Sequence, residues 1–330
     1  MNKAKIKKVA IETIHSIRKI EFSKLDISEC NKNYISTFLP HINYNFKIFS
    51  DVIYKLLDDE ISPDYIVDFG GGHGFLSLFL KRLGLNVIYC DHNPLLVKTI
   101  TCIKKEIGYG PDIIIEGSSP ELLSFCKTNN LLPNYLIATD LIEHVYDLNS
   151  LFSDFQALNP KLSMIFTTGS VKSNLLKSEK LRKMMIEDER NEYFPLRKQF
   201  LVENYPGKTS SEIEKLAAMT RGLKFTDIKQ HVDKYLETTI LPVVDIDKYN
   251  TCDPINGNWT ERILSKNQYR KIIKQNHFQV SFKNGFYNDE RNNPVTCFAA
   301  KIINYFVRYL NLSVSLFAPF IILKVKPFQE

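Results

Sequence analysis

Two kinds of feature that would assign this chain to a secreted or membrane class are missing. Its six cysteines include no C-x-x-C pair, and its first residues lack the long apolar core of a signal peptide. The most apolar region, residues 298–325, is interrupted by Lys301, Asn304 and Arg308, so it falls short of the ~20 uninterrupted apolar residues of a membrane span. We therefore expect a globular, cytoplasmic protein without a zinc site or a membrane span.

The net charge of +6 is concentrated at the N-terminus. Residues 1–20 contain six lysines and arginines against one acid, Glu12, so five of the six excess charges lie there. Apolar residues from Ile6 to Ile17 recur at helical spacing beneath these charges, which predicts a basic amphipathic helix. We interpret it as a helix packed on the domain with a solvated basic face. Peripheral contact with anionic lipid is the alternative.

A glycine-rich turn follows a predicted buried strand over residues 65–69. The strand carries Asp68, and Gly70, Gly71, Gly72 and Gly74 follow it. Glycines let a backbone approach a ligand closely and adopt positive φ. The helical stretch 75–83 and a second apolar run, 86–90, complete a predicted βαβ unit with a ligand at its first turn.

Two carboxylates select among the nucleotide-like ligands that such a turn would suit. Asp68 would repel a pyrophosphate but attract a ligand that carries an ammonium and a sulfonium. Position 75 is Phe, so the dinucleotide pattern G-x-G-x-x-G is incomplete. Asp91, at the end of the second run, is predicted to accept both hydroxyls of a ribose, with His92 beside it in the same site.

Four stretches in order resemble the class I methyltransferases that use S-adenosylmethionine, in particular the branch of the ubiquinone-biosynthesis O-methyltransferases. The matching stretches are 67–74, 89–91, 138–145 with 158–160 and 164–168, and 318–327. The resemblance implies S-adenosylmethionine as the cofactor. It also implies an α/β fold with a Rossmann-like, mostly parallel sheet of seven strands, of which the last is antiparallel.

The predicted elements divide the chain into three parts. A helical cap inserted after the fifth strand would cover the acceptor side of the pocket. The predicted parts are N-terminal helices (1–60), a cofactor domain (61–170 and 259–330) and the cap (171–258). The strands are placed at 65–69, 86–90, 112–116, 134–139, 162–168 and 316–325, and the helices at 3–20, 33–39, 43–57, 173–193, 210–237, from near Arg262, and at 297–310.

The catalytic prediction rests on the end of the fourth strand. A hydroxyl acceptor needs a group that takes its proton, and Asp140, Glu143 and His144 are the candidates. In related O-methyltransferases the corresponding acid and histidine lie against the methyl donor, so Asp140 is also expected to contact the cofactor. Some relatives are associated with a divalent ion, so Mg²⁺ on Asp140 and Glu143 is an alternative, although no metal ligand is assigned. Asp140 as a helix cap and His144 as a core histidine are the structural alternatives.

Substrate contacts are predicted from the cap and from departures from the family pattern. Many relatives have an acid after the third strand that binds adenine. This chain has the sequence Gly-Ser-Ser-Pro-Glu at residues 117–121, so Ser118 and the backbone are expected to take that contact. Arg221, Trp259 and Arg262 are candidates for a planar or anionic acceptor, with structural anchoring as the alternative.

The sequence predicts O-methylation of a small-molecule hydroxyl. The Asp/Asn-Pro-Pro-aromatic motif, a Pro-Cys nucleophile and a basic stripe are all missing, which argues against nucleic acid as the substrate. A sugar or glycan precursor is placed ahead of a quinone-type phenol because the cap is polar. The alternatives are a quinone or lipid precursor at the membrane surface, a non-catalytic S-adenosylmethionine-binding protein whose cap is a partner interface and, more distantly, a dehydrogenase.

Overall fold

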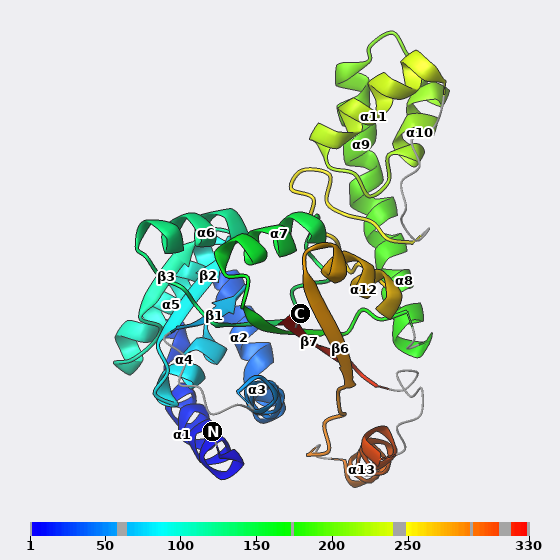
Figure 1. The fold of residues 1–330 in the computed structure, drawn as a ribbon. Helices are drawn as coiled ribbons and strands as arrows, with labels where there is room; N and C mark the ends of the chain where they lie inside the picture. The colour runs from blue at the N-terminus through cyan, green and yellow to red at the C-terminus, as the bar shows by residue number, and fades with distance from the viewer. Residues whose placement is uncertain are drawn as a thin grey trace.

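A seven-stranded sheet forms the centre of the molecule in the computed structural model, which describes residues 2–57, 65–172, 175–239, 249–290, 293–309 and 318–328 (Figure 1). The strand order is β3-β2-β1-β4-β5-β7-β6. The first five strands are parallel, and β7 pairs antiparallel with both β5 and β6. This confirms the predicted sheet, including its antiparallel last strand. The strands are β1 (Ile66–Phe69), β2 (Val87–Asp91), β3 (Ile113–Glu116), β4 (Tyr135–Thr139), β5 (Ser163–Thr168), β6 (Phe278–Asn284) and β7 (Ile321–Pro327).

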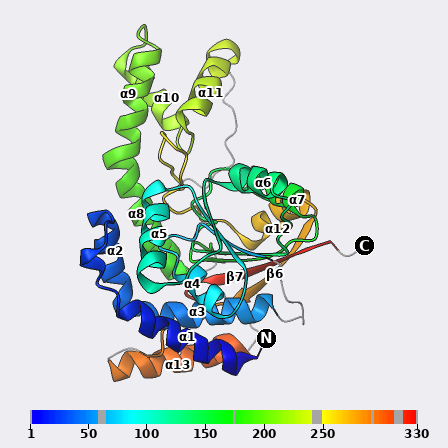
Figure 2. The same cartoon turned by 90° about the vertical axis from the view of Figure 1, so that its left-hand side faces the viewer.

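Helices cover both faces of the sheet because alternate residues of the buried strands point to opposite sides. Ile66 of β1 belongs to the core shared with α1, α3, α4 and α5, whereas Val67 and Phe69 belong to the core shared with α6, α7 and α12. Figure 2 shows the same layers from the side. The helices are α1 (Lys3–Arg18), α2 (Glu29–Phe38), α3 (Ile42–Leu56), α4 (Phe75–Arg82), α5 (Pro94–Ile107), α6 (Ser119–Thr128), α7 (Leu148–Leu158), α8 (Leu175–Asp188), α9 (Phe194–Asn204), α10 (Ser210–Met219), α11 (Phe225–Thr238), α12 (Lys266–Gln275) and α13 (Pro294–Tyr309).

Strand β6 was not placed by the sequence analysis. Its signal is a period of two, in which Phe278, Val280 and Phe282 alternate with polar residues. Only Phe278 is fully buried, since β6 is the edge strand next to β7. A half-exposed edge strand has fewer apolar residues than the central strands. Its polar positions therefore left no continuous apolar run from which a strand would be predicted.

The inserted helices differ from the two that the sequence predicted. The first prediction, 173–193, begins outside the described residues. From Leu175 the chain runs through α8, a π-helical turn at Glu189–Tyr193 and α9 without interruption. The second prediction, 210–237, was wrong in its continuity, because Gly222 adopts a φ of +75° and separates α10 from α11. Helices α9, α10 and α11 share an apolar cluster of their own and project away from the sheet (Figure 1).

Two helices begin at other residues than the sequence predicted, because capping residues decide where a helix begins. Ser28 caps α2, which therefore starts at Glu29 rather than at residue 33, and Ser265 caps α12, which starts four residues after Arg262. Strand β7 starts at Ile321, and the start predicted for it at residue 316 lies outside the described residues. The predicted end of the last helix, Leu310, and the predicted boundary of the N-terminal part, residue 60, also lie outside them. None of the helices in the described ranges combines the length and the apolar character that crossing a bilayer requires.

Candidate functional site

A cavity of about 950 Å³ opens beyond the carboxyl ends of β1, β2 and β4. This is the edge at which open α/β sheets bind ligands. The predicted site residues on its wall are Asp68, Gly70, Gly71, Gly72, Asp91, His92, Ser118, Asp140 and His144. The cavity thus brings together the predicted cofactor end and two of the three predicted catalytic residues.

The glycine turn is fastened to the end of β2. The backbone N–H groups of Gly70 and Gly71 donate to the carbonyl of Cys90, and the N–H of Gly72 donates to Asp91 Oδ2 at 2.9 Å. A Cβ on Gly71 would lie 2.6 Å from the ring of Tyr89, so no side chain fits there. The backbone itself therefore forms this part of the cavity wall.

Gly74 and Gly72 provide a matched pair for testing the turn. Both have positive φ, +77° and +54°, but a Cβ on Gly74 would lie 2.1 Å from Ile100 Cδ1, whereas one on Gly72 meets nothing within 4 Å. We expect Gly74→Ala to lower the free energy of unfolding by about 2–5 kcal/mol and Gly72→Ala by about 1–2 kcal/mol. Urea denaturation measures both, and equal losses would contradict the packing difference.

Asp68 is a buried acid at the floor of the cavity. It is 2% exposed and accepts a hydrogen bond of 2.6 Å from Ser77 Oγ on α4. Burial, reinforced by the nearby charge of Asp91, raises the pKa of Asp68 to about 7. A cationic ligand group placed beside this carboxyl would favour its ionised form.

Asp91 and Ser118 are oriented by local hydrogen bonds. The two carboxylate oxygens of Asp91 accept from the backbone N–H groups of Gly72 and Asn93, both at 2.9 Å, and each oxygen keeps a further lone pair. Ser118 Oγ donates to Glu121 Oε2 at 2.8 Å and, in the capping box of α6, accepts from the backbone N–H of Glu121. One lone pair of its oxygen remains available for a ligand. His92 is exposed at the cavity wall, with its Nδ1 3.8 Å from Asp91 Oδ1.

Asp140 lies in a left-handed backbone conformation directly after β4, with a φ of +50°. Its N–H donates to the carbonyl of Thr167 at 3.1 Å, which holds the residue at the cavity floor. Water reaches Asp140 through the open cavity, yet the protein packed around it raises the pKa of its carboxyl, and Lys177 partly opposes that shift. Non-glycine residues with positive φ cluster at functional sites.

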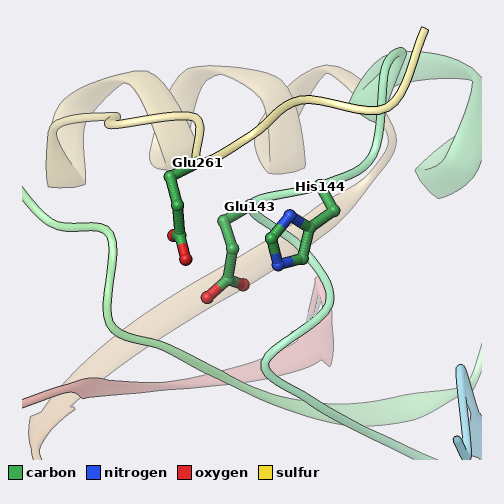
Figure 3. Close-up of side chains that lie close together, drawn as sticks. All are labelled: Glu143, His144 and Glu261. Atoms are coloured by element: carbon green, nitrogen blue, oxygen red, sulfur yellow. The ribbon is translucent and has the colours of Figure 1, made fainter. Parts of the chain in front are cut away.

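Figure 3 shows Glu143, His144 and Glu261 with their side chains turned toward one another. One ligand atom from each lies within 4.8 Å of the others. His144 Nδ1 lies 2.9 Å from the carbonyl oxygen of Trp259, which can only accept, so Nδ1 carries the proton and Nε2 keeps its lone pair. Glu143 is 3% exposed with no hydrogen-bond partner on Oε2, and burial, reinforced by Asp140, raises its pKa to about 8.

Glu261 is a residue of this cluster that the sequence analysis did not assign. Residues 259–262, which we call the returning segment, are held by backbone hydrogen bonds against the loop that follows β4. Trp259 N–H donates to the carbonyl of His144, and Arg262 N–H donates to the carbonyl of Glu143. These contacts join residues more than 110 positions apart. No local pattern in the sequence signals such a pairing.

The cluster differs from the Asp140 and Glu143 pair that was the alternative for Mg²⁺. Two carboxylates and one imidazole form a donor set that suits zinc, manganese or iron better than magnesium, which favours oxygen ligands throughout. The unpartnered oxygen of Glu143 is an atom that a cation would satisfy. Nothing in the described residues supports the Mg²⁺ alternative.

The three residues predicted to contact the substrate do not line the cavity. The Arg221 guanidinium donates to the carbonyls of Tyr249 and Asn250, and Trp259 is 3% exposed with its ring stacked on Tyr146. Arg262 donates to the carbonyl of Tyr146 at 3.3 Å. In the structure these side chains anchor loops.

Helices α2 and α3 supply a wall of the cavity that the sequence analysis missed. This wall includes Tyr34, Phe38, Ile48 and Phe49, and the ring of Tyr34 stacks on His73 with 4.6 Å between centroids. Tyr34 and Asp140 line the same cavity, and burial, reinforced by the charge of Asp140, raises the pKa of Tyr34. Polar residues of the insertion lie elsewhere on the wall: Lys224, Asn256 and Asn258.

The buried acids make stability depend on pH. The pKa of Glu143 rises from 4.5 to about 8 and that of Asp68 from 3.8 to about 7, so the folded protein holds protons that the unfolded chain releases. Their stabilising effect is present at low pH and is lost as pH rises through the folded pKa values. Between pH ~5 and ~7 each group should lower the free energy of unfolding by about 1.4 kcal/mol per pH unit. Denaturation of the wild type and of Glu143→Gln should give a shallower decline for the variant, and parallel curves would contradict the assignment.

Comparisons with known proteins found matches to this chain among solved structures but not among family models or curated sequences. Solved structures similar to it include an S-adenosylmethionine-dependent methyltransferase from Clostridium acetobutylicum, with 11% identity over 91% of this chain and 100% of that one and a TM-score of 0.45. A second, from Methanosarcina mazei, has 12% identity over 84% and 98% of the chains and a TM-score of 0.44.

A third similar structure is the magnesium protoporphyrin IX methyltransferase of Synechocystis with bound S-adenosylhomocysteine, with 13% identity, 86% and 83% coverage and a TM-score of 0.39. Likeness at this level says nothing about the reaction of this chain. The fold follows instead from the sheet, which has the seven strands, mostly parallel, and the antiparallel last strand that the resemblance implies. The chain therefore has the Rossmann-like α/β fold of the class I methyltransferases.

Proposed function

We propose that this protein is an S-adenosylmethionine-dependent methyltransferase that acts on a hydroxyl of a small molecule. The observation that carries the proposal is one cavity lined both by the glycine turn with its acids and by Asp140 with His144. Its volume of about 950 Å³ is at the upper end of the range for small-molecule sites, which suits a cofactor and an acceptor together.

The residues present fit the cofactor. Asp68 would bind the ammonium group, Asp91 would accept the ribose hydroxyls, and Ser118 with its neighbouring backbone would contact the adenine. At Gly72, which lines the cavity, a Cβ would meet nothing within 4 Å, so the turn leaves open space there. When bound, S-adenosylmethionine supplies an electrophilic methyl group.

His144 is the group we assign to take the proton of the acceptor hydroxyl. Its Nδ1–H is committed to Trp259, which leaves the Nε2 lone pair as the base. Asp140, at the floor of the same cavity, would orient the hydroxyl. Buried Glu143 holds a proton at neutral pH and would keep the region beneath His144 uncharged.

We propose a different order of acceptors from the one that the sequence predicts. The polar cap favours a sugar or glycan precursor, but Tyr34, Phe38 and Phe49 form an aromatic part of the cavity wall. These side chains favour an acceptor with a planar or apolar body next to its hydroxyl. Lys224 would suit a polar or anionic group at its far end.

Turnover is the test. Purified protein, S-adenosylmethionine and separate pools of phenolic, lipid-linked and sugar acceptors are assayed for release of S-adenosylhomocysteine. We expect release with the phenolic or lipid-linked pool. Calorimetric binding of S-adenosylhomocysteine without turnover on any pool would favour the non-catalytic alternative, and thermal stabilisation by nicotinamide cofactors alone would favour the dehydrogenase.

A further inference from the structure

Helix α13 exposes the apolar side that a helix of a globular protein normally buries. Val295 is 76% exposed, Phe298 66% and Tyr305 61%, and Ile302 and Phe306 are exposed beside them. At about 100° per residue these five positions fall within a stripe about 100° wide. Large apolar side chains therefore form one continuous outward face, which we call the α13 face.

The opposite side of α13 attaches it to the protein. Ala300 and Val307 are buried there. The side chain of Asn304 accepts from the N–H of Tyr287 at 2.7 Å and donates to its carbonyl at 2.9 Å. Small and polar residues thus fasten the helix, and its orientation leaves the bulky apolar residues outside. Exposed apolar patches of this kind mark interaction sites.

We propose that the α13 face and the basic N-terminal helix together dock this protein on an anionic membrane surface. Figures 1 and 2 place α13 and α1 on the same side of the sheet. Lys3, Lys5, Lys7 and Lys8 are exposed on α1. Helix α13 carries Lys301 and no acid. An apolar stripe and a basic surface on the same side of the molecule match the composition of interfacial helices, which bury the stripe among acyl chains and the cations among anionic headgroups.

Charge and size favour lipid over a second copy of the chain. Two identical basic surfaces would repel each other, whereas anionic headgroups would attract them. The acids nearest the start of α13, Asp289 and Glu290, are paired with Lys47. A pair of 16-residue helices, each about 24 Å long, also offers less contact than a standard protein interface.

Docking would place the acceptor wall near the lipid. Helix α3 packs against α1 and also lends Ile48 and Phe49 to the cavity. An acceptor with an apolar body could then enter from the membrane side. The docking proposal itself does not depend on methyl transfer.

Vesicle sedimentation of the full chain tests the proposal. We expect the wild type to pellet with vesicles of equal parts phosphatidylcholine and phosphatidylglycerol, and to stay in the supernatant with phosphatidylcholine alone. Phe298→Asp with Ile302→Asp should lower the partition coefficient at least tenfold. Lys7→Ala with Lys8→Ala should lower it by about fivefold per lysine, and roughly 0.5 M salt should act similarly.

Matched controls change the same charges elsewhere. Leu132→Asp with Val202→Asp adds two acids at apolar positions that are 58% and 55% exposed. Lys183→Ala with Lys229→Ala removes two exposed lysines from the insertion. Both should retain vesicle binding within about twofold, apart from long-range electrostatics. Ile302→Trp keeps the face apolar and should show a blue shift with anionic vesicles, because the native Trp259 is buried.

Three results would overturn the proposal. The first is a wild type that does not pellet with anionic vesicles, and the second is a Phe298→Asp, Ile302→Asp variant that binds them as well as the wild type. The third is light scattering that shows a dimer which this variant dissociates, without any blue shift of Ile302→Trp on vesicles. That result would assign the α13 face to a second copy of the chain.

Discussion

Replacing Asp91 with alanine is expected to abolish binding of S-adenosylhomocysteine. The variant lacks the carboxylate that would form two charge-assisted hydrogen bonds to the ribose. The N–H of Gly72 also loses its partner at 2.9 Å, so the glycine turn would become less ordered. At about 1.5–3 kcal/mol for each bond, affinity should fall by more than about 100-fold. Isothermal titration calorimetry on protein with a wild-type circular dichroism spectrum measures the change.

Glu116→Ala is the matched control for that loss. Glu116 is the register partner of Asp91 on the neighbouring strand β3, but it is exposed and does not line the cavity. Its removal should leave affinity within about twofold. A 2′-deoxy analogue separates the two effects of Asp91→Ala, because it should bind the wild type more weakly and lose less on mutation. A variant that keeps its affinity within threefold would contradict the site.

Replacing His144 with glutamine is expected to lower kcat while leaving the cofactor affinity in place. The change removes the Nε2 lone pair, and loss of a general base costs about 100- to 10,000-fold in rate. Steady-state kinetics with an acceptor identified by the release assay measures kcat, and calorimetry measures the affinity. A kcat within a few-fold of the wild type would exclude His144 as the base.

His144→Asn separates the base from its anchor. Asparagine can still donate to the carbonyl of Trp259 from the position of Nδ1, but it has no atom at Nε2. If the base is what matters, both variants should lose rate by similar factors. Recovery of rate in His144→Asn alone would assign the histidine to holding the returning segment. A loss of wild-type activity on dialysis against EDTA would instead indicate a cation on Glu143, His144 and Glu261.

The arrangement of the glycine turn and its two acids was readable from the sequence because it is local. Asp68, the glycine turn and Asp91 lie within one βαβ unit, and backbone geometry fixes how the parts of such a unit meet. The central strands were placed within about a residue for a related reason, since strands buried on both faces are apolar throughout.

The rest of the cavity wall was not readable in this way. Polarity of the cap suggested Arg221, Trp259 and Arg262, but buried polar groups must find hydrogen-bond partners, and the nearest partners were backbone carbonyls of loops. The wall came from Tyr34 and Phe49 instead, on helices whose spacing predicted only that they would pack. Which face of a helix meets a cavity depends on the elements beside it.

The sequence by itself determined the α/β class, the positions of the central strands and the acids at the ends of the first two strands. Each of these features depends on residues within about one turn or one strand of each other. Only the tertiary structure decided that Glu261 meets Glu143 and His144, that α2 and α3 border the cavity, and that α13 turns its apolar face outward. Each of those outcomes is a contact between elements far apart in the chain. Such contacts are selected by burial and hydrogen bonding of the whole molecule, which no local pattern records.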